Sequence, residues 1–219
     1  MKELTDITVI LDKSVSMSPR TKATIEGFNG FLQTQKLVDG KANLTLIQFA
    51  EPYTYQKTYD SVDIQKVLDL TEETYRAVGG STAYLDALGK AINETGERFK
   101  NLPERQRPNK VVFVVITDGE ENSSREFKKP AIAEMIKHQE DVYKWEFVFL
   151  GANMDATSEG TSLGVKAGNT MTYAFSNDGI KRSYAATSKN LANYRSNLVA
   201  DMSFAQEDRD EQKVESITK

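Results

Sequence analysis

Side chains of types that bind hard cations occur at three places along this chain. The first apolar segment is followed by Asp12, Ser14 and Ser16, at every second residue. Asp118 comes directly after a second apolar segment, and Thr82 stands between them in a Gly-Gly-Ser-Thr turn. These side chains offer only carboxylate and hydroxyl oxygens, which suit Mg²⁺, Mn²⁺ or Ca²⁺ better than zinc or copper. The sequence therefore predicts an oxygen-lined site for one divalent cation.

The composition excludes several other kinds of site. None of the 219 residues is cysteine, so disulfides, thiolate zinc sites and cysteine nucleophiles are ruled out. The net charge is −4 and no basic patch is visible, which argues against nucleic acid as a partner. No apolar stretch approaches the roughly 20 residues of a membrane span, and the polar N-terminus lacks a signal-peptide core. We therefore expect a cytoplasmic protein that does not bind membranes.

The candidate ligands can meet only if the segments before them are strands of one sheet. Four apolar runs do not alternate with polar residues, as is typical of strands buried on both faces. A fifth segment alternates, follows a Glu-Pro turn and predicts an antiparallel edge strand, and a sixth segment is weaker. In chain order the six predicted strands cover residues 7–11, 44–49, 53–59, 111–117, 146–150 and 170–175.

Apolar residues at helical spacing lie between these segments. Ser18 and Pro19 predict the start of the first helix, and a stripe from Ile180 to Leu198 predicts the last. The alternation predicts an α/β fold: a doubly wound, mostly parallel six-stranded sheet with one antiparallel edge strand and helices on both faces. We expect one domain over residues 1–200, and a charged tail over residues 201–219 that is a helix end or disordered. Ligands of such sheets bind at the carboxyl ends of the strands.

The motifs resemble the metal-ion-dependent adhesion site of von Willebrand factor A domains. Asp12-x-Ser14-x-Ser16, Thr82 and Thr117-Asp118-Gly119 occur in the family's order, at a strand end, a helix start and a strand end. The resemblance covers roughly residues 4–198. It implies that Ser14, Ser16 and Thr82 bind the ion directly, and that Asp12 and Asp118 act mostly through water.

The same resemblance implies how such a site would be used. Mg²⁺ takes six oxygens, and neutral hydroxyl ligands leave part of this sphere open while two aspartates offset the charge. Members of the family commonly bind an Asp or Glu of a protein partner at the open position. Intracellular prokaryotic relatives often work beside AAA+ ATPases or in stress and defence systems, and the compact, cysteine-free chain suggests a stand-alone prokaryotic or phage protein.

Neighbouring polar residues have two interpretations each. Asp86 is either an outer-shell partner of the metal or a solvated helix residue, and Glu120, Glu121 and Asn122 form either a partner-binding rim or an ordinary charged loop. The turn formed by Gly151, Ala152 and Asn153 either lines the same edge or is an ordinary turn after a strand. Serine, threonine and aspartate after strands also serve as helix caps, so each predicted ligand taken singly has that alternative.

The alternative function is a metal-dependent phosphotransferase or phosphatase. Haloacid-dehalogenase-like enzymes need a second carboxylate two residues after the first, and Ser14 occupies that position here. A serine hydrolase is disfavoured because the chain has no G-x-S-x-G motif and His138 is its only histidine. The sequence therefore favours a binding module over an enzyme.

Overall fold

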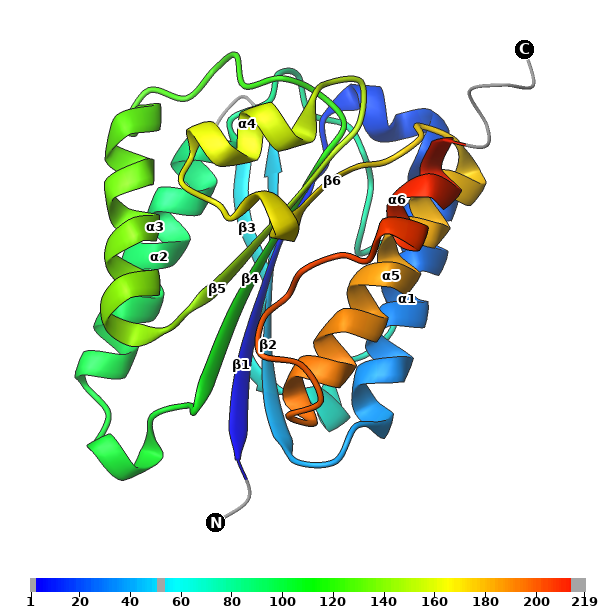
Figure 1. The fold of residues 1–219 in the computed structure, drawn as a ribbon. Helices are drawn as coiled ribbons and strands as arrows, with labels where there is room; N and C mark the ends of the chain where they lie inside the picture. The colour runs from blue at the N-terminus through cyan, green and yellow to red at the C-terminus, as the bar shows by residue number, and fades with distance from the viewer. Residues whose placement is uncertain (1–2, 51–53, 214–219) are drawn as a thin grey trace.

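A single mixed sheet of six strands forms the centre of the protein, in a computed structural model that describes residues 3–50 and 54–213 (Figure 1). The strand order is β3-β2-β1-β4-β5-β6, with only β2 and β3 antiparallel. The strands are β1 (Leu4–Asp12), β2 (Lys41–Ala50), β3 (Thr54–Asp63), β4 (Lys110–Thr117), β5 (Glu146–Gly151) and β6 (Thr170–Thr172). This arrangement confirms the predicted doubly wound fold with one antiparallel edge strand.

Helices cover both faces of the sheet and bury its apolar side chains. The α-helices are α1 (Thr21–Leu37), α2 (Tyr84–Lys100), α3 (Lys129–Tyr143), α4 (Ala156–Ser162), α5 (Asn177–Arg195) and α6 (Gln206–Lys213). Figure 1 shows α1, α5 and α6 on one face and α2, α3 and α4 on the other. Two separate buried clusters result, one including Phe28 and Leu191, the other Leu88 and Ile132. The non-alternating strands arise because apolar side chains are buried on both sides.

The strand order reverses between β1 and β4. The chain leaves β1 through α1 toward β2, whereas it enters β4 from α2 on the opposite face. Because β1 and β4 run parallel, the loops that follow them leave the same edge of the sheet and diverge there. Such a point leaves a crevice between the two loops, which is where ligands bind in folds of this type.

Several element boundaries differ from the sequence prediction, and two of the differences have a clear packing reason. The first α-helix begins at Thr21, because Pro19 lies inside a preceding 3₁₀ helix, Val15–Arg20, whose Met17 side chain is fully buried. Strand β6 ends at Thr172 instead of residue 175. The chain turns there because Tyr173 points into the core, where it is 2% exposed. The predicted Glu51-Pro52 turn lies outside the described residues.

The described part of the expected charged tail lies against the domain. Met202 and Phe204 are buried, and the Phe204 amide donates to the Gly168 carbonyl at 2.9 Å. Within α6, the Gln212 side chain accepts a hydrogen bond from the Ala174 amide at 3.2 Å. Residues 214–219 lie outside the description. None of the helices described above is long and apolar enough to cross a membrane.

Candidate metal centre

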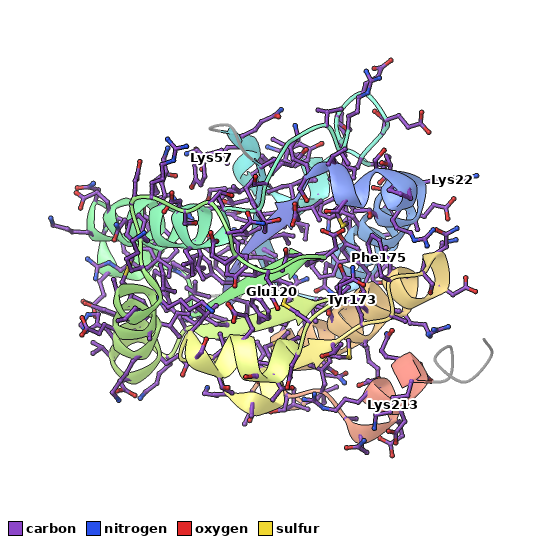
Figure 2. The ribbon with its side chains drawn as sticks, turned by 90° about the horizontal axis from the view of Figure 1, so that it is seen from above. Lys22, Lys57, Glu120, Tyr173, Phe175 and Lys213 are labelled. Carbon is purple, nitrogen blue, oxygen red and sulfur yellow. The ribbon has the colours of Figure 1, made fainter. Side chains whose placement is uncertain are left out.

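Four of the five predicted ligands are linked at the carboxyl ends of β1 and β4. The hydroxyl oxygens of Ser14 and Ser16 are 2.9 Å apart, and the Ser16 hydroxyl donates to Asp118 Oδ1 at 2.8 Å. Asp12 Oδ1 accepts the Ser14 amide at 2.7 Å. Figure 2 views the molecule from this edge, with Glu120 and Tyr173 near its middle. The two strand ends therefore form one polar cluster.

Thr82 is brought to the same cluster by the segment before α2. Residues Ser14 and Gly79 form a short parallel bridge, which fixes this segment beside the end of β1. The Thr82 amide donates to the Asn122 side chain at 3.0 Å, and the Thr82 carbonyl accepts the Asn122 amide at 3.2 Å. A side chain at Gly119 would place its Cβ 3.5 Å from the Thr82 hydroxyl. Thr82 therefore faces the turn that follows Asp118.

Burial makes the two carboxylates of the centre costly to ionise. Asp12 is fully buried, and this burial raises its pKa from 3.8 to about 6, despite hydrogen bonds from Ser14 and Thr117 that favour the charged form. The nearby Asp118 charge adds to the increase. Burial also raises the pKa of Asp118. Among the described residues neither aspartate has a Lys or Arg ion-pair partner, so the protein itself does not balance their charge.

One carboxylate oxygen of the centre has no hydrogen-bond partner. Asp118 Oδ2 is inaccessible to solvent and unpaired, whereas Asp118 Oδ1 accepts from Ser16. This oxygen can therefore accept a bond from a ligand that enters the centre. No group of three or more His, Cys, Asp and Glu side chains placed to hold a metal ion occurs in the described ranges. Two carboxylates with three hydroxyls instead form an oxygen-only donor set, which fits a hard divalent cation.

Three hydrogen-bond donors of the centre, of which only Thr117 was named as part of a motif, were given no role by the sequence analysis. The Thr117 hydroxyl donates to Asp12 Oδ2 at 2.7 Å. The hydroxyl of Tyr75 donates to the Asp12 carbonyl at 2.8 Å, and that of Tyr173 donates to the Thr117 carbonyl at 3.0 Å. Thr117 could have been suspected because it precedes Asp118. No local pattern marks the two tyrosines, which come from loops far away in the chain.

The acidic side chains near the centre bind backbone amides. Glu121 accepts hydrogen bonds from the amides of Leu85, Ser123 and Ser124. Asp86 accepts from the amides of residues 125, 126 and 127. Both carboxylates therefore fix the loop between β4 and α3, a role that neither sequence interpretation of Asp86 anticipated.

The edge around the centre is completed by two polar residues. Asn153 donates to the Asp118 carbonyl at 3.0 Å, so the turn after β5 does line the same edge. Glu120 is exposed to solvent. The rim of the centre thus combines residues that follow β4 and β5.

Comparison with known proteins identifies a family and a shared fold. The profile of the von Willebrand factor type A domain matches residues 6–177. One similar structure is that of proximal thread matrix protein 1 from the mussel byssus, which is described as having a zinc-occupied MIDAS motif. Its sequence is 17% identical and the TM-score is 0.58. The match covers 87% of this chain and 46% of the byssus protein chain. A comparison with curated proteins gives no match.

Two bacterial structures share the fold at similar distance. The von Willebrand factor type A protein from Catenulispora acidiphila is 16% identical with a TM-score of 0.54, over 88% of this chain and 43% of its own. The pilus adhesin SpaC from Lactobacillus rhamnosus GG, in an open conformation, is 13% identical with a TM-score of 0.59. The match covers 87% of this chain and 30% of the adhesin chain. This chain therefore spans less than half the length of each of these proteins.

Proposed function

Because the chain belongs to the von Willebrand factor type A domain family, we propose that it is a metal-dependent protein-binding module and not an enzyme. The cation would be held at the carboxyl ends of β1 and β4 by the five residues described above. The observation that carries this proposal is the buried, unpaired Asp118 Oδ2, because an acidic, oxygen-lined cluster without a counter-charge calls for a cation.

Each residue of the centre would contribute in a defined way. Ser14, Ser16 and Thr82 would supply neutral hydroxyl oxygens, and Asp12 and Asp118 would balance the charge. A bound cation supplies a coordination position that an incoming carboxylate can take. Asp12 is already held by the Ser14 amide and the Thr117 hydroxyl, so its carboxylate is oriented before any ion binds.

We propose Mg²⁺ as the ion, with Mn²⁺ or Ca²⁺ as substitutes. Hydroxyl and carboxylate oxygens suit Mg²⁺, which binds through few protein ligands and keeps several waters. The byssus protein described with zinc shows that a site of this type can hold another divalent ion in that protein. Without sulfur or imidazole in the donor set, zinc has no preference for this centre.

The proposed partner is a protein that offers an Asp or Glu side chain. An AAA+ ATPase or a component of a stress or defence system in the cytoplasm is the candidate that the family resemblance suggests. The rim supports a protein partner because it is formed by several loops of a rigid sheet and includes the exposed Glu120. Nucleic acid and membranes are not proposed as partners.

The first experiment measures metal binding to the purified chain by isothermal titration calorimetry. We expect one Mn²⁺ or Mg²⁺ per chain, and a loss of affinity of at least about tenfold in Thr82→Ala, since even outer-shell partners contribute that much. Thr34→Ala is the matched control, because Thr34 is an exposed residue of α1 whose hydroxyl bonds only within its own helix. An unchanged affinity in Thr82→Ala would remove this residue from the site.

The second experiment captures the partner from the source cell. Wild-type and Thr82→Ala proteins are used as bait in Mg²⁺ and in EDTA, and bound proteins are identified by mass spectrometry. We expect one partner that is retained only by wild type with Mg²⁺ and is lost when one of its acidic residues is replaced. Capture that survives EDTA and Thr82→Ala alike would place the interface elsewhere. Metal-dependent hydrolysis of phosphate esters that disappears in Thr82→Ala would favour the enzyme alternative.

A further inference from the structure

Two buried tyrosines end on the backbone of the two strands that carry the metal centre. Tyr75 and Tyr173 are 0% and 2% exposed. Their hydroxyls donate to the carbonyl oxygens of Asp12 and Thr117, at 2.8 and 3.0 Å. One tyrosine thus reaches the end of β1, and the other reaches the end of β4.

Each of the two carbonyls belongs to an acidic ligand or to the residue beside one. The first belongs to Asp12 itself, and the second belongs to Thr117, which precedes Asp118. Thr117 also donates through its hydroxyl to Asp12 Oδ2 at 2.7 Å, so the second anchor bears on both aspartates. A shift of either carbonyl would therefore move a carboxylate of the centre.

Both tyrosines lie outside the ends of β1 and β4 that they contact. Tyr75 lies in the connection between β3 and α2, which also carries Thr82, and its amide donates to the Thr71 carbonyl at 2.8 Å. Tyr173 follows β6, and its amide donates to the Gly151 carbonyl at 3.0 Å. Each tyrosine is fixed by a backbone hydrogen bond of its own amide, so each hydroxyl reaches a strand end from a separate part of the chain.

A third tyrosine of the same core separates packing from anchoring. Tyr184, on α5, is also buried, but its hydroxyl has no hydrogen-bond partner. In all three residues the ring fills the core, as phenylalanine would. Only in Tyr75 and Tyr173 does the hydroxyl add a bond to the centre.

We propose that Tyr75 and Tyr173 are positioning residues of the metal centre, which fix the ends of β1 and β4 so that Asp12 and Asp118 are held at the spacing a divalent cation requires. This inference rests on the proposed function. It identifies hydroxyl groups that act on metal affinity without touching the ion, in the way that outer-shell hydrogen bonds orient metal ligands.

The test compares three variants that each lose one buried hydroxyl: Tyr75→Phe, Tyr173→Phe and Tyr184→Phe. Mn²⁺ dissociation constants are measured by calorimetry, and melting temperatures are measured in EDTA. We expect Mn²⁺ affinity to fall about tenfold in the first two variants, the lower end of outer-shell effects, and to stay within about twofold of wild type in the third. A purely structural role would change melting temperatures and leave the dissociation constant of the folded protein unchanged.

Each outcome decides a separate claim. Wild-type affinity in both Tyr75→Phe and Tyr173→Phe would overturn the positioning role and leave the metal site intact. A wild-type protein that binds no Mn²⁺ would overturn the proposed function, and the positioning role would fall with it. If one variant fails to fold, the other tests the same claim at the other strand end.

Discussion

Replacing Asp12 with asparagine separates the metal-binding role of this residue from a structural one. In Asp12→Asn the amide oxygen can accept the Ser14 amide, as the carboxylate does at 2.7 Å. The new NH₂ group can donate to the Thr117 hydroxyl, whose proton can turn to the Gly119 carbonyl 3.1 Å away. The substitution therefore keeps the hydrogen bonds and the shape, and it removes only the buried charge.

The magnitude follows from the pKa of Asp12. Burial raises this pKa from 3.8 to about 6 in the metal-free protein. At about 1.4 kcal/mol per pKa unit, the charged side chain lowers the free energy of unfolding by about 3 kcal/mol. The folded protein holds the proton more tightly than the unfolded chain. The decrease in the free energy of unfolding therefore grows as the pH rises from about 4 to about 6, and it stays constant at higher pH. In EDTA we expect Asp12→Asn to be more stable than wild type at pH 7.5, with little difference near pH 4.

The assay is urea unfolding of both proteins at pH 4 and pH 7.5, in EDTA and in excess Mg²⁺. At a concentration one hundred times its dissociation constant, Mg²⁺ should stabilise the wild type by about 2.7 kcal/mol. The variant should gain much less, because it lacks one carboxylate of the centre. Mg²⁺ should also bind the wild type more weakly below pH 6, where a proton competes for Asp12. An Asp12→Asn protein that is less stable than wild type in EDTA at pH 7.5 would refute this reasoning.

Two further predictions concern the scaffold and use urea unfolding as the measurement. Gly27→Ala should destabilise the protein by about 1–3 kcal/mol, because the added Cβ would lie 2.4 Å from the Tyr184 ring. Gly30 lies in the same helix, and a Cβ added there would meet no atom within 4 Å, so Gly30→Ala should instead stabilise the protein by up to about 1 kcal/mol. If the two substitutions changed the free energy of unfolding equally, the close packing of α1 on α5 would be refuted. Arg98→Ala should lower the free energy of unfolding by about 3–5 kcal/mol, because the buried Asp6 carboxylate would lose its two hydrogen bonds of 2.8 and 3.0 Å to Arg98. A decrease below about 1 kcal/mol would show that this ion pair is weak.

The strands of this fold were predictable because their signal is local. Runs such as residues 111–116 are apolar at every position, and burial on both faces of a covered parallel sheet requires that pattern. Element ends were less predictable. Proline at position 19 is compatible with the first turn of an α-helix and with the 3₁₀ helix that forms, and the buried Met17 side chain selects the second.

The roles of acidic residues near the centre were not predictable from the sequence. Glu121 and Asp118 lie on the same loop, and both could be ligands on composition alone. The structure turns Glu121 toward the backbone amides of its own loop and of α2, which satisfy the carboxylate there. Asp118 Oδ2 is left without a partner. Which carboxylate finds amide donors depends on the path of the loop between packed elements, and that path is a property of the whole fold.

The sequence by itself determined the chemistry of the proposed centre. Oxygen side chains directly after β-branched strands, in a chain without cysteine, favour a hard divalent cation at the proposed site, and the parallel strands bring those side chains to one edge. Only the tertiary structure decided how the centre is held and how it is charged. Tyr75 and Tyr173 reach the strand ends across 63 and 56 residues of chain, and the pKa of Asp12 is raised because the packed core excludes water from its carboxylate.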